Sequence, residues 1–157
     1  MAHRLQDSNP RACPTASRLR ILLVDDSQLV IERLREMLGP LPGFEIAGQA
    51  ISVREALRLF PRVKPDVLLL DLHMADGSGL EVLEKVKRRK PPPFVVVLTN
   101  TTFRRSRQKC LDAGADFCFD KSAEFKKIPG VLRGLMRTSP RSGSRPSFSR
   151  ARPLRKA

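Results

Sequence analysis

Short runs of apolar residues alternate with amphipathic segments through the middle of the chain. Five runs have the length of a strand, and they lie at residues 21–24, 44–47, 67–70, 94–98 and 117–119. Most of them are continuously apolar rather than alternating, which is typical of strands that are covered on both faces. The pattern therefore predicts five strands buried inside one domain.

The segments between these runs carry apolar residues at the spacing of an α-helix. Residues 53–60 and 128–135 place them at i, i+3, i+4 and i+7, and residues 30–38 form a third apolar stripe. Ser27 precedes this third stripe at the position of an N-cap, and Gly39 follows it as a helix end. Three helices are therefore expected in these segments.

Two further segments predict helices with more polar faces. Residues 78–89 place apolar side chains inward and two pairs of opposite charge outward, four residues apart. These pairs are Glu81 with Lys85 and Glu84 with Arg88. Residues 104–113 are only weakly amphipathic, because Ser106 and Arg107 occupy positions that should face the core. We expect a helix there with an incomplete core-facing stripe.

Strands that alternate with helices predict an α/β fold with a parallel sheet, because parallel neighbours need crossover connections. The helices cover both faces, which makes a three-layer, doubly wound domain. The crossovers are expected to be right-handed. In such sheets the functional site lies beyond the carboxyl ends of the strands, so this edge is where chemistry is expected.

Four of the five runs deliver a polar residue at or just past their carboxyl ends. The first run is followed by Asp25 and Asp26, the third by Asp71, the fourth by Thr99 and the fifth by Lys121. Three carboxylates, a hydroxyl and an ammonium group are therefore expected at one edge of the sheet.

Three neighbouring carboxylates repel one another unless a cation shares them. Magnesium fits this set, because it is a hard ion that takes one or a few carboxylates, keeps waters and brings a substrate phosphate with it. The hydroxyl of Thr99 and the ammonium group of Lys121 can then hold phosphoryl oxygens. The constellation suits an aspartate that accepts a phosphoryl group, with Asp71 as the nucleophile.

Each of these residues also has an ordinary explanation when it is taken alone. Asp25 and Asp26 could be acids that interact with the N-terminal dipole of the first helix. Asp71 could be a turn residue, Thr99 a strand-end threonine and Lys121 a solvated lysine. Their occurrence together favours a shared site over these separate explanations.

The same residues lie in motifs that resemble the receiver domains of bacterial two-component response regulators. The motifs are "VDDS", "LLLDLHMADGSGLEVL", "VLTN" and "GADFCFDKS", in this order and at the spacing of one domain. The resemblance covers roughly residues 19–137 and implies a flavodoxin-like fold with strand order 2-1-3-4-5.

The resemblance also implies a role for each site residue. Asp25, Asp26 and Asp71 would bind Mg2+ together with the backbone carbonyl of His73. Asp71 would be phosphorylated by a sensor histidine kinase or a phosphotransfer protein. The phosphoryl group would be contacted by two further residues, Thr99 and Lys121.

The chain departs from the family pattern at positions that modulate the switch. Asn100 follows Thr99 where a small residue is usual, and Cys118 stands where the family usually has an aromatic residue. Asn100, Thr101 and Cys118 are therefore candidate modulating positions.

A basic run on the expected helix at 104–113 is a further candidate. It is usually just a solvated face, but in the resembling family this helix forms a signalling face with the last strand and the last helix. The candidate docking residues for a downstream target are Arg104, Arg105, Arg107 and Lys109.

The charge of the chain is concentrated at its two ends. Of the net charge of +14, residues 1–20 contribute +3 and residues 138–157 contribute +6. Neither end carries enough apolar residues to offset the entropy of ordering. We expect a disordered arm at 1–18, a receiver domain at 19–137 and a disordered basic tail at 138–157.

The remaining composition limits the classes of function. An odd number of cysteines, three in all, favours a reducing compartment. The longest purely apolar run has five residues, so neither membrane insertion nor a signal peptide is expected, and the sequence favours a cytoplasmic protein.

Two functions remain from the sequence. The first is a phospho-acceptor signalling protein without an attached effector domain, which is not an enzyme beyond slow self-phosphotransfer and autodephosphorylation. The second is a receiver-like interaction module that does not use phosphate. Such a module could bind nucleic acid or an anionic surface through its basic tail, with the steep salt dependence of electrostatic binding.

Overall fold

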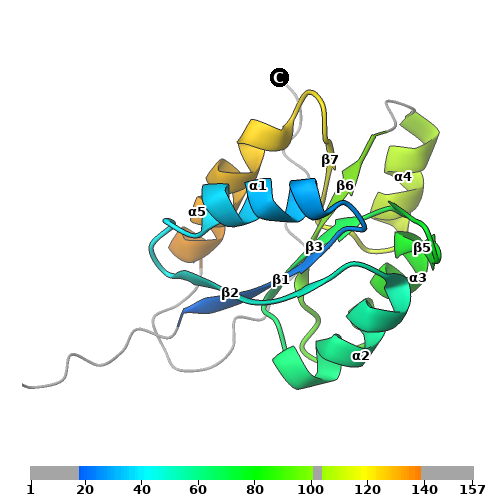
Figure 1. The fold of residues 1–157 in the computed structure, drawn as a ribbon, viewed down its shortest axis with the longest axis horizontal. Helices are drawn as coiled ribbons and strands as arrows, with labels where there is room; N and C mark the ends of the chain where they lie inside the picture. Colours follow the sequence, from blue (N-terminus) through cyan, green and yellow to red (C-terminus); the bar gives the residue numbers. More distant parts are fainter. Residues whose placement is uncertain (1–17, 101–103, 139–157) are drawn as a thin grey trace, which may run out of the picture.

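The computed structural model describes residues 18–100 and 104–138 (Figure 1). Thr101, the N-terminal arm up to residue 17 and the basic tail from residue 139 lie outside the described residues. Among the residues that are described, no helix is long and apolar enough to cross a membrane.

One parallel sheet of five strands forms the middle layer. Its strands are β1 (Leu19–Val24), β2 (Phe44–Ala50), β3 (Val67–Asp71), β6 (Phe94–Thr99) and β7 (Phe117–Asp120). Their order across the sheet is β2-β1-β3-β6-β7. Counting these five strands along the chain gives 2-1-3-4-5, so the predicted fold class and strand order are confirmed.

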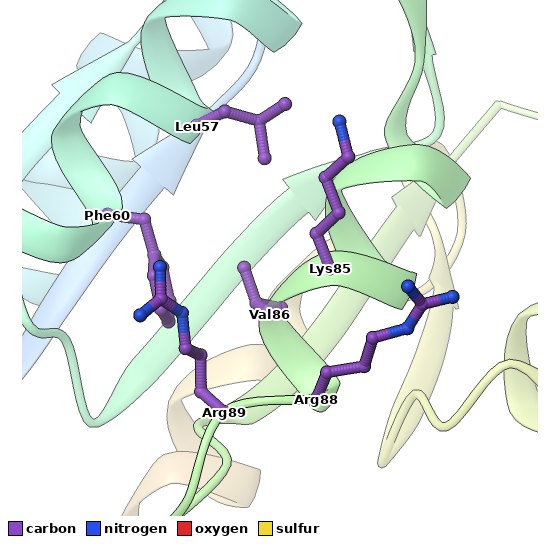
Figure 2. Close-up of a pocket in the computed structure, with 6 residues that line it drawn as sticks. All are labelled: Leu57, Phe60, Lys85, Val86, Arg88 and Arg89. Atoms are coloured by element: carbon purple, nitrogen blue, oxygen red, sulfur yellow. The ribbon is translucent and has the colours of Figure 1, made fainter.

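Helices cover both faces of the sheet. One face carries α1 (Gln28–Leu38) and α5 (Ile128–Thr138), with the 3-10 helix η1 (Phe125–Lys127) directly before α5. The opposite face carries α2 (Val53–Val63), α3 (Gly79–Lys87) and α4 (Arg104–Asp112). On this second face α2 and α3 pack against each other, and a groove lies between them (Figure 2).

Alternate side chains of each strand supply the two halves of the core. In β1, Ile21 and Leu23 pack with α1 and α5, whereas Leu22 and Val24 pack with α2 and α3. All six residues of β6 are buried. The continuous apolar runs are thus explained by burial on both faces.

Serine side chains begin the helices at the carboxyl edge of the sheet. Ser27 caps α1, as predicted, by accepting a hydrogen bond from the Val30 amide, and Ser52 caps α2 in the same way. The helix α4 has a single buried residue, Cys110, which agrees with its weak pattern in the sequence.

Neither η1 nor a small antiparallel hairpin that follows β3 was predicted from the sequence. The hairpin consists of β4 (His73–Met74) and β5 (Gly77–Ser78). Strands of two residues are too short to show the alternation by which strands are recognised in a sequence. The hairpin matters because it lies directly beside the carboxyl edge.

Candidate functional site

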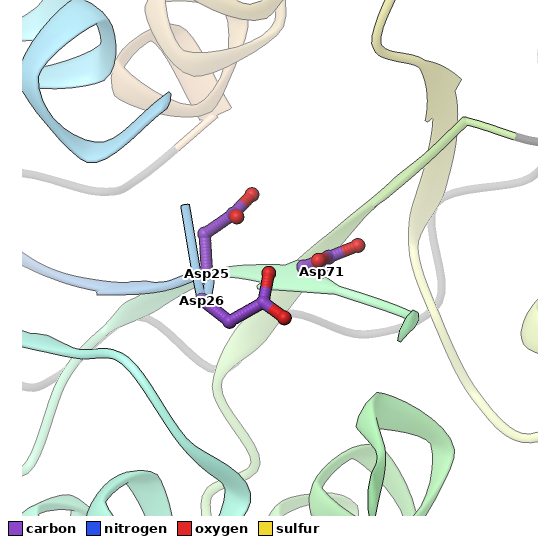
Figure 3. Close-up of side chains that lie close together, drawn as sticks. All are labelled: Asp25, Asp26 and Asp71. Atoms are coloured by element: carbon purple, nitrogen blue, oxygen red, sulfur yellow. The ribbon is translucent and has the colours of Figure 1, made fainter. Parts of the chain in front are cut away.

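Three aspartates meet at the carboxyl edge of the sheet (Figure 3). Asp25 and Asp26 follow β1, and Asp71 is the last residue of the neighbouring β3. One carboxylate oxygen of each lies within 4.8 Å of the others. Asp25 and Asp71 are buried and Asp26 is exposed, so the cluster has a buried side and an open side.

Backbone amides hold each of the three carboxylates in place. Asp25 Oδ1 accepts from the amide of Ser27 at 2.9 Å, and Asp71 Oδ1 accepts from the amide of His73 at 3.2 Å. Asp26 Oδ2 accepts from the amide of Ala75 at 3.0 Å. These bonds fix the orientation of the side chains, as expected for a preorganised site.

Lys121, at the end of β7, brings a positive charge to the two buried aspartates. Its Nζ lies 2.5 Å from Asp25 Oδ2 and 3.3 Å from Asp71 Oδ2. The contact with Asp25 is an ion pair without the angles of an ordinary hydrogen bond. One ammonium group therefore contacts two of the three carboxylates, and no ion pair joins Asp26 to Lys121 in the described structure.

The pKa of Asp71 reflects its burial first and its charged neighbours second. Burial raises the pKa of this carboxyl most strongly and the nearby Asp25 raises it further, whereas Lys121 and the His73 amide lower it. The net effect is a raised pKa. A second cation would favour the ionised carboxylate.

The donor set fits a magnesium ion. The three converging oxygen atoms belong to carboxylates, which are the ligands that magnesium prefers, and the exposed side of the cluster leaves access for water. The resemblance seen in the sequence implies a Mg2+ site at these aspartates, and their geometry agrees with that expectation.

A pocket of about 300 Å3 opens over this cluster. Asp26, Asp71 and Lys121 contribute to its wall. Seven further residues also line it, namely Ser27, Val30, Arg33, His73, Asn100, Ser122 and Phe125. The pocket therefore joins the acidic cluster to the predicted modulating residue Asn100 and to the predicted ligand residue His73.

Thr99 lies beside the cluster at the end of β6. It is buried, and its backbone carbonyl accepts a hydrogen bond from the amide of Lys121 at 2.8 Å. The two residues that the sequence assigned to phosphoryl contacts are thus tied together through the backbone.

Arg33 is a pocket residue that the sequence analysis missed. Its guanidinium group lies over the ring of Phe125, 4.9 Å from the ring centroid. It lies three residues beyond Val30 on the face of α1 that lines the pocket, and this spacing is the signal that could have found it. The guanidinium adds positive charge on the α1 side of the pocket.

The hairpin between β3 and α3 depends on Gly79 and Asp76, which were also missed. A Cβ atom on Gly79 would lie 2.0 Å from the backbone oxygen of Asp71, so only glycine allows this close approach. Asp76 accepts from the amides of Val53 and Arg54 at 2.9 and 3.2 Å and so fastens the hairpin to the N-terminus of α2.

Cys118 lies in β7 and faces α4, away from the pocket. It is buried against Cys110, and the hydrogen bond with the Cys110 thiol, together with burial, raises the pKa of Cys118. The neighbouring rings of Phe117 and Phe119 stack on each other and pack in the core on the opposite side of the sheet. No aromatic side chain of β7 therefore points to α4.

The basic residues of α4 lie on its outer surface. Arg104, Arg105, Arg107 and Lys109 are all exposed. Within the described residues Arg107 alone among them has an acidic partner, Glu124, at 3.6 Å.

Comparison with known proteins gives one consistent family. A model of the response regulator receiver domain matches residues 21–133. The chain is 32% identical over 122 residues to a protein-glutamate methylesterase/protein-glutamine glutaminase of Alkalilimnicola ehrlichii, covering 76% of this chain and 30% of that protein. It is 34% identical over 97 residues to the DNA-binding transcriptional activator DevR/DosR of Mycobacterium tuberculosis, covering 62% of this chain and 45% of that protein.

A solved structure supports the fold. The signal receiver domain of a DNA-binding response regulator (merR) from Colwellia psychrerythraea 34H superposes with a TM-score of 0.71 at 24% identity, covering 76% of this chain and 99% of that one. The chain spans less than half the length of both curated relatives.

Proposed function

Because the chain belongs to the response regulator receiver domain family, we propose that Asp71 accepts a phosphoryl group and that this changes the binding of a partner protein. The observation that carries the proposal is the pocket in which Asp71 lies beside Asp26 and Lys121. A buried carboxylate with a neighbouring ammonium group is suited to attack phosphorus and to hold the charge that it receives.

The transfer forms one bond and breaks another. An oxygen of the Asp71 carboxylate bonds to the phosphorus of a phosphohistidine on the donor protein. The P–N bond breaks, its electron pair stays on the imidazole nitrogen, and an acyl phosphate is left on Asp71. Hydrolysis by water later returns the carboxylate and releases inorganic phosphate, with the proton passing to phosphate or solvent.

The residues around Asp71 prepare this step. Lys121 lies next to the attacking carboxylate and would form an ion pair with the phosphoryl group once it is transferred. The amide of His73 keeps the carboxylate oriented. We propose that the Thr99 hydroxyl donates a hydrogen bond to a phosphoryl oxygen. Asn100 lies on the pocket wall, where it would control the approach of donor and water.

Asp25, Asp26 and Asp71, with the His73 carbonyl, would hold Mg2+. When bound, this ion supplies positive charge that offsets both the carboxylates and the phosphoryl oxygens. The chain's own part is to hold the three oxygen ligands together, which it does through the amides of Ser27, Ala75 and His73.

The partners that we propose follow from the family. The donor is a sensor histidine kinase or a phosphotransfer protein, and the target reads the face formed by α4, β7 and α5. The exposed Arg104, Arg105, Arg107 and Lys109 favour an acidic surface on that target. We assign receiver function to residues 19–137, with Thr101 and Cys118 as modulating positions.

A labelling experiment tests the acceptor. The full chain is incubated with Mg2+ and acetyl phosphate, and its intact mass is measured with time. We expect a gain of one phosphoryl group in the parent chain, none in Asp71→Asn, and an unchanged gain in Asp112→Asn, which alters an exposed aspartate. Equal labelling of Asp71→Asn would contradict the assignment.

Beryllofluoride supplies a second readout that does not depend on phosphoryl transfer. Its binding with Mg2+ is followed by NMR shifts at the amides of Thr99 and Lys121. If neither reagent acts on the parent chain while a control receiver responds to both, the phosphate-independent interaction module becomes the better function.

A further inference from the structure

A groove between α2 and α3 lies at the opposite end of these helices from the acidic cluster. It has a volume of about 330 Å3 and is lined by six residues, namely Leu57, Phe60, Lys85, Val86, Arg88 and Arg89. Both helices begin near the carboxyl edge and run back along the sheet, so the groove beside their C-terminal halves is separate from the phosphorylation site.

The floor of the groove is apolar. Leu57 and Phe60 come from α2, and Val86 faces them from α3 (Figure 2). Phe60 and Val86 are buried, but Leu57 is only half-buried and keeps apolar surface open to solvent. An occupant with an apolar side chain would remove this surface from water.

The rim of the groove is basic. Lys85 rises on one side, Arg89 extends along the side where Phe60 lies, and Arg88 points outward (Figure 2). No acidic side chain lines the groove. An anionic occupant would therefore meet positive charge on two sides.

The two arginines differ from the two lysines within α3. Lys85 pairs with Glu81 at 2.7 Å, and Lys87 pairs with Asp116 at 2.6 Å. Within residues 18–100 and 104–138, neither Arg88 nor Arg89 forms an ion pair. The Glu84–Arg88 pair that the sequence suggested is not formed there, although its four-residue spacing would allow it.

The helix dipole explains part of this arrangement. Cations at the C-terminus of α3 are favoured by its partial negative charge. This accounts for basic residues at the helix end, but not for their position around an exposed apolar floor. The combination points to a ligand that carries both an apolar group and carboxylates.

We propose that this groove docks an acidic segment of a partner protein. The segment would insert one apolar side chain against Leu57 and Val86 and place carboxylates beside Arg88 and Arg89. Arginine suits this role, because its planar guanidinium group can bind a carboxylate through two parallel hydrogen bonds. The chain's own terminal segments are poor occupants, because both carry net positive charge.

The inference does not depend on phosphorylation of Asp71. It concerns a different face of the molecule, and the docking groups carry their charge whether or not the acidic cluster is modified. The two proposals can therefore fail separately.

Peptide display provides a test without a known partner. A library of random peptides is selected against the full chain, and the affinities of enriched peptides are measured with the groove variant Arg88→Glu/Arg89→Glu. We expect peptides in which one large apolar residue is bracketed by Asp or Glu, and an affinity loss of at least about tenfold in the variant.

A charge-matched variant on the opposite face of the sheet is the control. Arg35→Glu/Lys126→Glu makes the same change in net charge at exposed positions of α1 and η1 and should leave the affinity of these peptides unchanged. Peptides that lose as much affinity in this control variant as in the groove variant would overturn the proposal, and so would peptides that lose affinity only in Arg104→Glu/Arg105→Glu on α4. Enriched peptides without acidic residues would overturn it as well.

A second variant tests the apolar floor. Leu57→Asn should weaken the selected peptides while Arg58→Asn, at the adjacent exposed position, should not. Thermal unfolding of both variants verifies that they fold. Equal affinity of the Leu57 variant and the parent chain would mean that no apolar side chain enters the groove.

Two further measurements separate this proposal from other occupants and from the proposed function. A single-stranded DNA oligonucleotide that binds the parent chain, loses binding in the groove variant and displaces the peptides would identify the occupant as a nucleic acid and overturn the proposal. We expect Asp71→Asn to bind the selected peptides as the parent chain does, and the groove variant to retain labelling by acetyl phosphate.

Discussion

The carboxyl edge of the sheet and the groove between α2 and α3 both gather like charges, but they hold them in different ways. At the edge, Asp25 and Asp71 are buried, and each is held by a backbone amide and faces Lys121. At the groove, Arg88 and Arg89 are exposed and form no ion pair among the described residues.

This difference follows from solvation. A buried charge must find partners inside the protein, because it has lost its water. An exposed charge is stabilised by water, so it needs no ion pair within the protein and is accessible to a group on another molecule. Breaking an internal partnership should therefore be costly at the edge and almost without effect on stability at the groove.

Removal of Lys121 should have the largest effect. Lys121→Met leaves Asp25 and Asp71 buried without their cation. We expect the free energy of unfolding at neutral pH to fall by about 3 kcal/mol in the presence of a chelator, which is the scale for breaking a buried ion pair. Urea denaturation measures this loss.

The matched control for this change is Lys126→Met, because Lys126 is exposed. It should change the free energy of unfolding by less than about 0.5 kcal/mol. If the two variants unfolded at the same urea concentration, Lys121 would not be compensating the acidic cluster.

Neutralisation of Asp71 should act in the opposite direction. Burial raises the pKa of Asp71 in the folded state, so the native protein favours the protonated carboxyl. The associated stability is present below the pKa of the unfolded chain and is lost as the pH rises through the folded pKa. At neutral pH we therefore expect Asp71→Asn to raise the Tm of the metal-free protein by a few degrees.

Two conditions sharpen this prediction. Near pH 3 Asp71 is protonated in both states, so the difference in Tm should disappear. Saturating Mg2+ should raise the Tm of the parent chain more than that of Asp71→Asn, because one ion ligand is missing in the variant. A variant that is less stable than the parent at neutral pH without metal would show that repulsion in the cluster is already relieved.

Asp76 is an exposed aspartate whose partners are backbone amides, and it lies between the two extremes. Its hydrogen bonds, first with the amide of Val53, lower the pKa of the carboxyl. The stability that it contributes is present above the unfolded pKa and is lost as the pH falls through the folded pKa. Asp76→Ala should therefore lower the Tm at neutral pH but not under strongly acidic conditions.

Thermal unfolding across this pH range tests Asp76, with Asp112→Ala as an exposed control on α4. The control removes a carboxylate that accepts only from a neighbouring glutamine side chain in the described structure. A loss of Tm in Asp76→Ala that is the same at every pH would assign the effect to something other than the charge of Asp76.

The sheet was the most predictable part of the molecule. Its apolar runs marked all five strands, because burial on both faces leaves little room for polar residues. The ends were less certain: β1 begins at Leu19 and β7 continues to Asp120, since backbone pairing extends past the apolar side chains. The hairpin was missed because each of its strands has only two residues, which is too short to show an alternation of apolar and polar side chains.

The site was predictable to the extent that it follows from topology. Parallel strands end at one edge, so Asp25, Asp26 and Asp71 had to meet there. The contact of Lys121 with Asp25 and the contact of Cys118 with Cys110 depend on side-chain orientation and packing, which spacing does not determine. The family roles of these residues remain predictions.

The smallest expected effect on stability belongs to the two groove arginines, and the adjacent Lys87 provides the contrast. Arg88→Gln/Arg89→Gln removes two exposed charges without ion pairs and should change the free energy of unfolding by no more than about 0.5 kcal/mol. Lys87→Gln, one residue earlier, removes a partly buried ion pair with Asp116 and a hydrogen bond to the Pro93 carbonyl. It should cost about 2 kcal/mol.

Urea denaturation of the two variants, measured side by side, shows which cations at this helix end contribute to the free energy of unfolding. If the double arginine variant were as unstable as Lys87→Gln, the arginines would have internal partners and the groove would lose its claim to an external one. If only Lys87→Gln is destabilised, Lys87 stabilises the fold through its ion pair with Asp116. Arg88 and Arg89 then do not contribute to stability and remain available to bind carboxylates of a partner protein.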